Sequence, residues 1–263
     1  RLRAALEYLR WQREALRLGV GGGELERLLH LYELNQDLLQ GVEGAPGVDF
    51  AQRRALVLSQ LRNLYLLQDR GPAQPYNRGG SPPGSEPLAT QPFDISVAQQ
   101  KLENMQRGAL GNGEDLLESL LPAARVEGPV EEARLQLALG DWRQWQGSSA
   151  RAGKAYAEVA RLLQEAGEEE LLGQWSAQPV ELPDNGAFWQ PATAPGGTLI
   201  SARFDVSARG RVSNIETAVD DPELEGRASA LRRRLVKTRF RPRWEAGEAR
   251  AVAGVQRDYL LRD

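Results

Sequence analysis

The chain has 263 residues, of which 41% are hydrophobic and 26% charged, so it is long enough for two domains and has the composition of an ordinary soluble protein. Its formal net charge of −3 gives no overall basis for nucleic-acid binding, and the absence of cysteine excludes disulfides, thiol nucleophiles and thiolate metal sites. The charge is uneven, because residues 198–263 carry 14 Arg or Lys and 10 Asp or Glu, net +4, which leaves −7 for residues 1–197.

No membrane-spanning segment is expected in these residues. No apolar run reaches the roughly 18 residues of a membrane-spanning helix. The first residue is Arg1 rather than Met, which suggests a mature or trimmed form. We therefore expect any signal peptide, lipid anchor or membrane helix to lie upstream of residue 1.

The N-terminal part has the leucine spacing of amphipathic helices. Apolar residues three and four apart predict helices over residues 1–18, 24–40 and 50–69, and Asp49 is a suitable N-cap for the third. Glycine-bearing loops join these helices, so we expect antiparallel hairpins. Residues 71–92 contain six prolines and four glycines and are expected to form a long loop without regular structure.

Helical periodicity resumes after this loop. Helices are expected over residues 96–107, 114–121, 130–146 and 148–166, separated by glycine- and proline-containing segments. In the last pair, the residues at the offsets of the tetratricopeptide (TPR) pattern are Leu139-Gly140, Ala152 and Tyr156. Small residues at two of these positions let the helices approach closely.

This pattern makes the helical body, residues 1–177, resemble a TPR array. Residues 178–197 contain several prolines and are expected to act as a linker, with Val180, Leu182, Phe188 and Trp189 pinning parts of it to the body.

The last quarter of the chain begins as a β-hairpin. Strict alternation of apolar residues from Ile200 to Val206 predicts a half-buried strand. Gly210 can take the positive φ of a short hairpin loop, and residues 212–219 form the second strand.

The period then changes to that of a helix. Asp221-Pro222 has the form of an N-cap followed by proline, and the helix is expected to stop at Phe240-Arg241-Pro242. Residues 244–248 are read as a connection and residues 251–261 as a third strand. Residues 198–263 are therefore predicted to be a ββαβ domain, and the whole chain to have the fold class α plus α+β.

The order of these elements resembles the C-terminal domain of TonB, the periplasmic energy transducer, and its relatives. The matching segments are FDVSARGRVSNIETAV, ALRRRLVKTRFRP and EAGEARAVAGVQRDYLL. Together with the helical body, they make the chain similar to TPR-containing TonB-like proteins of Gram-negative bacteria.

The resemblance implies a peptide-binding edge, because the TonB domain takes up a short peptide of outer-membrane transporters by strand addition. Residues 251–261 would be the edge strand. The contact residues implied are Val252, Gly254, Val255, Gln256 and Tyr259. The alternative is that the linker or a second copy of the chain, in a homodimer, covers this edge.

Two further surfaces each have a structural and a functional interpretation. Trp142, Arg143, Trp145 and Tyr156 either pack between the repeat helices or line a groove that holds a peptide.

The second surface is basic, since residues 227–243 contain eight Arg or Lys. It is either a solvated helix face or a contact for an anionic partner such as peptidoglycan. Its residues are Arg232, Arg233, Arg234, Lys237 and Arg241.

Enzyme chemistry has little support in the sequence. His30 lies among leucines with no cysteine available, and is interpreted as structural. The paired or tripled carboxylates are interpreted as helix-start charges rather than as acid/base or metal sites. They are Glu131-Glu132, Glu168-Glu169-Glu170 and Asp220-Asp221. We expect no catalytic residue, metal or cofactor.

These observations lead to one expected function with an alternative. We expect a non-enzymatic periplasmic adaptor or energy-transducer-like component of a TonB-type envelope system, which binds an extended peptide at its sheet and a second protein through its helices. The alternative is a scaffold that binds peptidoglycan through the basic helix. Nucleic acid is not expected as a partner.

Overall fold

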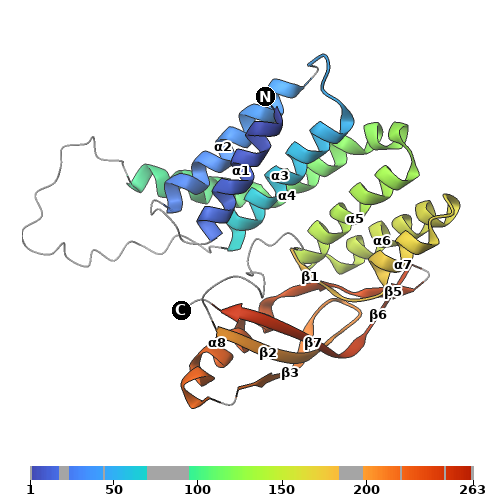
Figure 1. Ribbon diagram of the computed structural model, residues 1–263. Coiled ribbons are helices and arrows are strands. Elements are labelled where there is room, and N and C mark those ends of the chain that lie inside the picture. The colour runs from blue at the N-terminus through green and yellow to red at the C-terminus, as the bar shows by residue number, and fades with distance from the viewer. Residues whose placement is uncertain are drawn as a thin grey trace, which may run out of the picture. The chain divides into compact units, whose positions relative to one another are not determined.

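The computed structural model describes residues 2–17, 24–43, 45–69, 95–183, 198–219, 221–245 and 247–261 (Figure 1). This part of the chain is mostly helical, with small antiparallel sheets toward the C terminus. The chain divides into two compact units, Arg1–Gly113 and Glu114–Asp263, called here the first and second units. The predicted loop over residues 71–92 lies outside the described residues.

The first unit is built on three helices whose bounds are close to those predicted. They are α1 (Leu2–Arg17), α2 (Glu24–Val42) and α3 (Phe50–Asp69). Asp49 caps α3 as predicted: its carboxylate accepts from the Gln52 backbone N–H at 2.8 Å, and the Gln52 side chain accepts from the Asp49 N–H at 3.2 Å. Asn35 bonds to Leu56 and Asn63 to Leu31, so α2 and α3 run antiparallel.

The helices predicted over residues 96–107 and 114–121 are in fact one. The helix α4 runs from Ile95 to Glu127 and includes Pro122. Glycine lowers helix propensity by about 1 kcal/mol per residue but does not end a helix by itself. The buried residues of α4 keep a helical spacing across the predicted break: Leu102, Ala109, Leu117, Leu120 and Ala124.

Three helices follow in the second unit. They are α5 (Pro129–Trp145), α6 (Ser149–Glu165) and α7 (Glu169–Ser176). The ring of Tyr156 lies on Gly140, where an added Cβ would be 2.5 Å from Tyr156 Cε1. Gly140 therefore permits the close approach of α5 and α6 that the spacing predicted, with Ala152 fully buried beside it.

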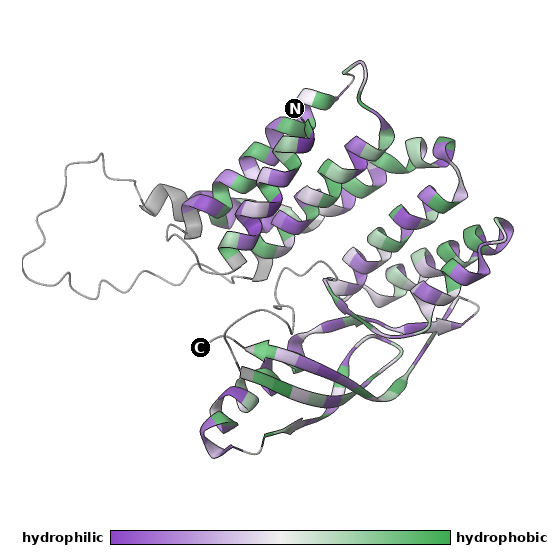
Figure 2. Cartoon of the chain, in the orientation of Figure 1, coloured by the Kyte–Doolittle hydropathy of each residue, from purple (hydrophilic) through white to green (hydrophobic). Residues whose placement is uncertain are grey.

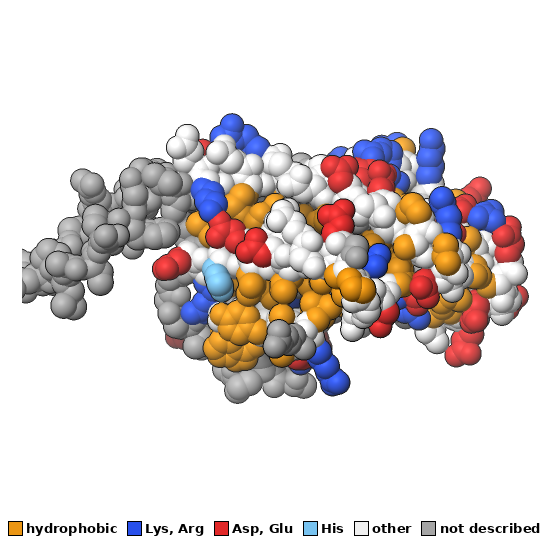
Figure 3. All heavy atoms as spheres, turned by 90° about the horizontal axis from the view of Figure 1, so that it is seen from above, with side chains coloured by type: hydrophobic (Ala, Val, Ile, Leu, Met, Phe, Trp, Pro, Cys, Tyr) orange, Lys and Arg blue, Asp and Glu red, His pale blue; other side chains and the backbone are white. Residues whose placement is uncertain are grey.

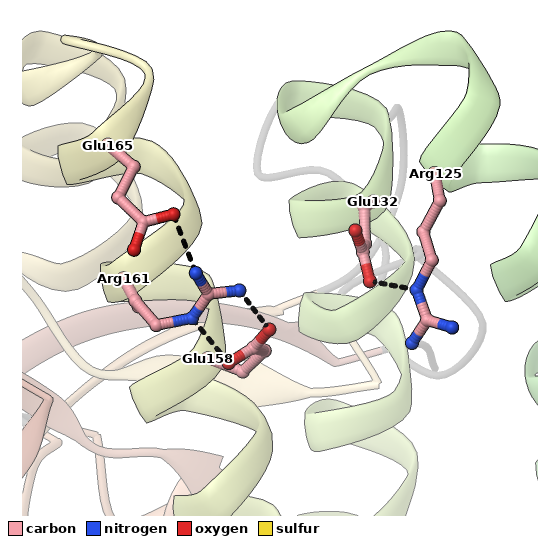
Figure 4. Close-up of polar contacts among 5 residues, drawn as sticks. All are labelled: Arg125, Glu132, Glu158, Arg161 and Glu165. Atoms are coloured by element: carbon pink, nitrogen blue, oxygen red, sulfur yellow. Dashed lines mark hydrogen bonds and ion pairs between the residues drawn. The ribbon is translucent and has the colours of Figure 1, made fainter.

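The acidic pairs occupy helix starts as predicted. Glu131 and Glu132 lie in the first turn of α5, and Glu169 in that of α7. Glu132 is buried and accepts from Arg125 Nε at 2.7 Å (Figure 4). On the exposed side of α6, Arg161 lies between two carboxylates of the same helix in Figure 4.

The main sheet is antiparallel and has three strands in the order β3-β2-β7. These strands are β2 (Thr198–Val206), β3 (Val212–Ala218) and β7 (Val252–Leu261), as the alternation predicted. One face packs on α8 (Glu225–Lys237). Its core residues are Ile200, Ala202, Phe204, Val206, Leu231, Leu235, Phe240 and Tyr259. Figure 2 shows the mixed hydropathy along these strands.

The start of α8 agrees with the prediction but its end does not. The Asp221 carboxylate accepts from the Glu223 N–H at 2.9 Å, and a short 3-10 turn, η1 (Pro222–Leu224), leads into the helix. The helix ends at Lys237, because Thr238 is extended. Strand β4 (Arg239–Arg241) follows where the prediction continued the helix.

Short strands replace two predicted connections. The strand β1 (Val180–Leu182), inside the predicted linker, pairs with β4, so Val180 and Leu182 belong to a sheet. The remaining linker residues, 184–197, including Phe188 and Trp189, lie outside the described residues. The strands β5 (Arg243–Glu245) and β6 (Glu248–Arg250) form a hairpin where a connection was expected.

The division into units also differs from the predicted boundary at residue 177. Helices α5 to α7 belong with the sheets in the second unit. Several contacts join them. Arg241 bonds to Asp141, the Gln144 side chain donates to the Phe240 carbonyl at 3.0 Å, and Trp244 stacks on Tyr156.

Candidate functional site

The strand β7 is an edge of the three-stranded sheet. It pairs along its length with β2, from Val252 opposite Val206 to Leu261 opposite Thr198. Among the described residues no strand pairs with its other side. The backbone N–H and C=O groups on that side are therefore a template on which an extended chain can add.

A β-bulge marks the start of this edge. The register between β2 and β7 shifts there, and Gly254 has a φ of +69°, a conformation that favours glycine. The Gly254 N–H donates to Asp205 Oδ1 at 2.8 Å, and Asn214 Nδ2 donates to Asp205 Oδ2 at 2.7 Å. The Asn214 bond first, and the Gly254 bond second, lower the pKa of Asp205. Asp205 thus ties the bulge of β7 to both other strands.

The two faces of the sheet differ in chemistry. Opposite the apolar core, a hollow of about 590 Å³ lies over the three strands. Arg203 of β2 stands between Glu216 of β3 and Gln256 of β7 in the strand register. Ser201 donates to Asp258 Oδ1 at 2.5 Å in the next row. This polar hollow adjoins the free edge of β7.

On the other face, Tyr259 is fixed inward. Its hydroxyl donates to Glu181 Oε2 at 2.9 Å, and Arg257 Nη1 lies 3.3 Å from the same oxygen. Burial, and after it the Glu181 charge, raise the pKa of Tyr259. The side chain of Tyr259 is 3% exposed, so it positions the strand and is not available to a partner.

The residues predicted to bind peptide therefore have different roles. Gln256 is exposed, while Val252 and Val255 are half-buried, Gly254 forms the bulge and Tyr259 is buried. The sequence did not indicate that Asp205 of β2 and Asn214 of β3 fix the bulge of β7. The only local signal was Asn214, whose residue type tolerates the positive φ of 51° that it adopts.

The residues predicted to line a repeat groove form packing contacts and ion pairs inside the second unit. Trp142 and Tyr156 are buried, and the Tyr156 hydroxyl donates to Asp141 at 3.0 Å. The rings of Trp142 and Trp145 are 5.3 Å apart, so both follow the packing interpretation. Arg143 pairs with Glu114 at 2.7 Å and Glu118 at 2.8 Å, both in α4.

The face of the α5–α6 pair also receives the chain's own Trp244. Its ring stacks on Tyr156 with centroids 5.8 Å apart, and it lies in one apolar cluster with Ala133 and Val159. A segment of the same chain thus lies against Tyr156, one of the residues for which a peptide groove was the alternative to packing.

The predicted basic surface is smaller than expected. Arg241 is 5% exposed and binds Asp141 through two bonds of 2.8 and 2.9 Å, so it belongs to the interior. Arg232 is half-buried and donates to Thr217 Oγ1 at 2.7 Å. Arg233 and Lys237 are exposed on α8. Arg234, also on α8, is half-buried.

His30 is exposed and its ring lies edge-on to Tyr8, with centroids 6.4 Å apart. No cluster of three or more His, Asp or Glu side chains suited to a metal ion occurs among the described residues. Within the same residues, no helix combines the length and apolar character needed to cross a membrane. Asp220 lies outside the described residues, and Asp221 is the cap already described.

Comparison of the chain with protein-family models, characterised proteins and solved structures finds no match. The functional argument therefore depends on the geometry of the molecule itself.

Proposed function

We propose that the protein is a non-enzymatic periplasmic adaptor that binds an extended peptide by strand addition at β7. In this proposal residues 198–263 serve as a TonB-like domain, and the helices form a TPR-like body that contacts a second protein in a TonB-type envelope system. The single observation that supports it is the position of β7, whose outer side pairs with no described strand.

An added strand would extend the order β3-β2-β7 by one. Backbone hydrogen bonds along β7 would supply most of the affinity, while alternate side chains of the peptide would supply specificity. On the polar face these side chains would lie beside Gln256 and Asp258, next to the 590 Å³ hollow. On the core face they would meet Arg257, whose side chain is 41% exposed.

Crosslinking from Gln256 tests the proposal. A photo-reactive amino acid at Gln256 should capture an extended segment of a partner protein from envelope extracts, and hydrogen exchange of the β7 amides should slow in the complex. The same amino acid at Glu216, exposed on the opposite edge strand, is the matched control and should not capture that segment. Crosslinks only between copies of this chain would contradict the adaptor function and indicate dimerisation through β7.

A second candidate is peptidoglycan binding by α8. Arg233 and Lys237 lie one turn apart, are exposed, and form no hydrogen bond or ion pair with any described residue. Changing both to Glu should abolish sedimentation of the protein with purified peptidoglycan. The matched control is the double variant Arg209→Glu with Arg211→Glu, which makes the same charge change in and just after the hairpin turn. Equal loss with both pairs, or no loss, would reject a specific role for α8.

A further inference from the structure

A layer of polar side chains crosses the core of the first unit where α1, α2 and α3 meet. Its members are Arg13, Asn35, Ser59, Gln60 and Asn63, and each is at most 9% exposed. Asn35 Nδ2 donates to the Leu56 carbonyl at 3.1 Å, and Asn63 Nδ2 donates to the Leu31 carbonyl at 3.1 Å. The layer thus holds several neutral groups and one positive charge.

The charge of Arg13 has no carboxylate partner among the described residues. Its Nη1 donates to Ser59 Oγ at 2.8 Å, to the Ser59 carbonyl at 3.4 Å and to Asn63 Oδ1 at 3.2 Å. All three acceptors are neutral, and no described residue accepts from Nε or Nη2. Burial, and after it the charge of Arg62, lower the pKa of Arg13 to about 10. The surroundings therefore lack the negative charge that a buried guanidinium group requires.

Two more arginines lie near this group. Arg62 follows Ser59 by one helical turn in α3, is exposed, and makes no hydrogen bond or ion pair with a described residue. Arg10 precedes Arg13 by one turn on α1, and its described carboxylate neighbour, Glu7, is 3.8 Å away and exposed. Because Arg13 bonds to Ser59 and Asn63, and Arg10 and Arg62 each lie one turn away along α1 and α3, the three side chains lie at the same contact between these helices. Burial, and after it the nearby charge of Arg10, lower the pKa of Arg62.

We propose that Arg10, Arg13 and Arg62 bind a phosphate group. The free Nε and Nη2 edge of Arg13 has the fork geometry that pairs with two oxygens of one anion, and three cations match the double charge of a phosphate. Neutral acceptors hold Nη1 and leave this edge for the ligand. The site lies in the first unit and does not depend on the function proposed for β7.

The phosphate can come from a soluble compound or from a lipid head group. Trp11 and Tyr8 of α1 are 63% and 41% exposed. Apolar side chains gather beside the histidine in Figure 3. Exposed aromatic side chains on one side of a helix, with arginines on another, are typical of helices that enter the head-group layer of a membrane. The experiment therefore includes both sources.

Isothermal titration of the full chain with inorganic phosphate, at constant ionic strength set by chloride, tests the site. We expect binding at one site per chain, with affinity reduced about tenfold or more in Arg62→Gln, since a charge-assisted bond is lost. Arg3→Gln removes an exposed charge from the same helix and should keep the affinity. Arg62 is at the surface, so its variant should fold even if Arg13→Gln does not.

Vesicles distinguish the two sources. Co-sedimentation with phosphatidylglycerol vesicles that is lost in Arg62→Gln and kept in Arg3→Gln would assign a lipid head group. Phosphate binding without vesicle binding would assign a soluble phosphate compound. Absence of both, or equal weakening in Arg62→Gln and Arg3→Gln, would overturn the proposal.

Discussion

The ion pair between Arg241 and Asp141 joins the helical part of the second unit to its sheets, and breaking it from one side should strongly destabilise the protein. The side chains are 6% and 14% exposed. Two bonds of 2.8 and 2.9 Å join them, and Arg241 Nη1 also donates to the Trp175 carbonyl at 3.2 Å. The Tyr156 hydroxyl donates to Asp141 at 3.0 Å. The pair is thus buried and extensively hydrogen-bonded.

Asp141→Ala leaves the guanidinium group of Arg241 in the interior without this carboxylate. Breaking a buried pair from one side costs about 3–5 kcal/mol, a large part of the about 5–15 kcal/mol by which a protein is stable. Arg241→Met should cost a similar amount, because the Asp141 carboxylate then loses its cation. In the double variant, Asp141→Leu with Arg241→Met, apolar groups replace both charges, so we expect much of the loss to be recovered.

Urea denaturation followed by far-UV circular dichroism and tryptophan fluorescence measures these changes, and the double-mutant cycle gives the coupling free energy. The control is Arg161→Ala, which removes an arginine with two carboxylate partners on the exposed side of α6 and should leave the denaturation midpoint nearly unchanged. Losses below about 1 kcal/mol in both single variants, or the absence of coupling, would refute the reasoning.

Gly140→Ala should destabilise the protein by about 1–3 kcal/mol despite the better helix propensity of alanine, because the new Cβ would lie 2.5 Å from the buried Tyr156 ring. Gly153→Ala has open space at its Cβ and should stabilise α6; equal denaturation midpoints for the two variants would contradict this. Asn214→Gly keeps the positive φ but removes the main cause of the low pKa of Asp205, so NMR titration should show that pKa rising toward its ordinary value. A folded pKa below the unfolded one gives stability that is lost as the pH falls through the folded pKa. Because the variant brings the folded pKa closer to the unfolded one, it should lose less stability in acid than the parent protein.

The sequence predicted most of the elements because their signals are local. Alternation from Ile200 to Val206 and the turn at Gly210 defined the hairpin, and Asp49 and Asp221 marked two helix starts. These patterns depend on the period of a strand or helix and on one or two neighbouring side chains.

Errors arose where a distant partner decides the conformation. Arg239–Arg241 is a strand because β1, nearly 60 residues earlier, pairs with it. The local signal, Pro242, indicated only that the helix must end before it. The break predicted at Gly111–Gly113 did not occur, since buried side chains on both sides hold α4 in one helix.

In the candidate sites, too, the sequence indicated some features and only contacts between distant residues showed the others. The resemblance to the TonB domain implied that β7 is an edge, but only the register shows that Tyr259 faces the core and Gln256 does not. The buried Arg13 looked like any other helical arginine, because its neutral surroundings come from α3 about 50 residues later. Likewise Arg241 was assigned to a basic surface until Asp141, 100 residues earlier, proved to bind it.

Local sequence patterns determined most of the helices and the three strands of the main sheet, since backbone conformation responds to neighbours within a few residues. The tertiary structure decided which charges are buried, which strand remains an edge and to which unit helices α5 to α7 belong. Those properties depend on contacts between segments far apart in the chain. They affect stability strongly because burying a charge or a polar group costs free energy unless a partner compensates for it.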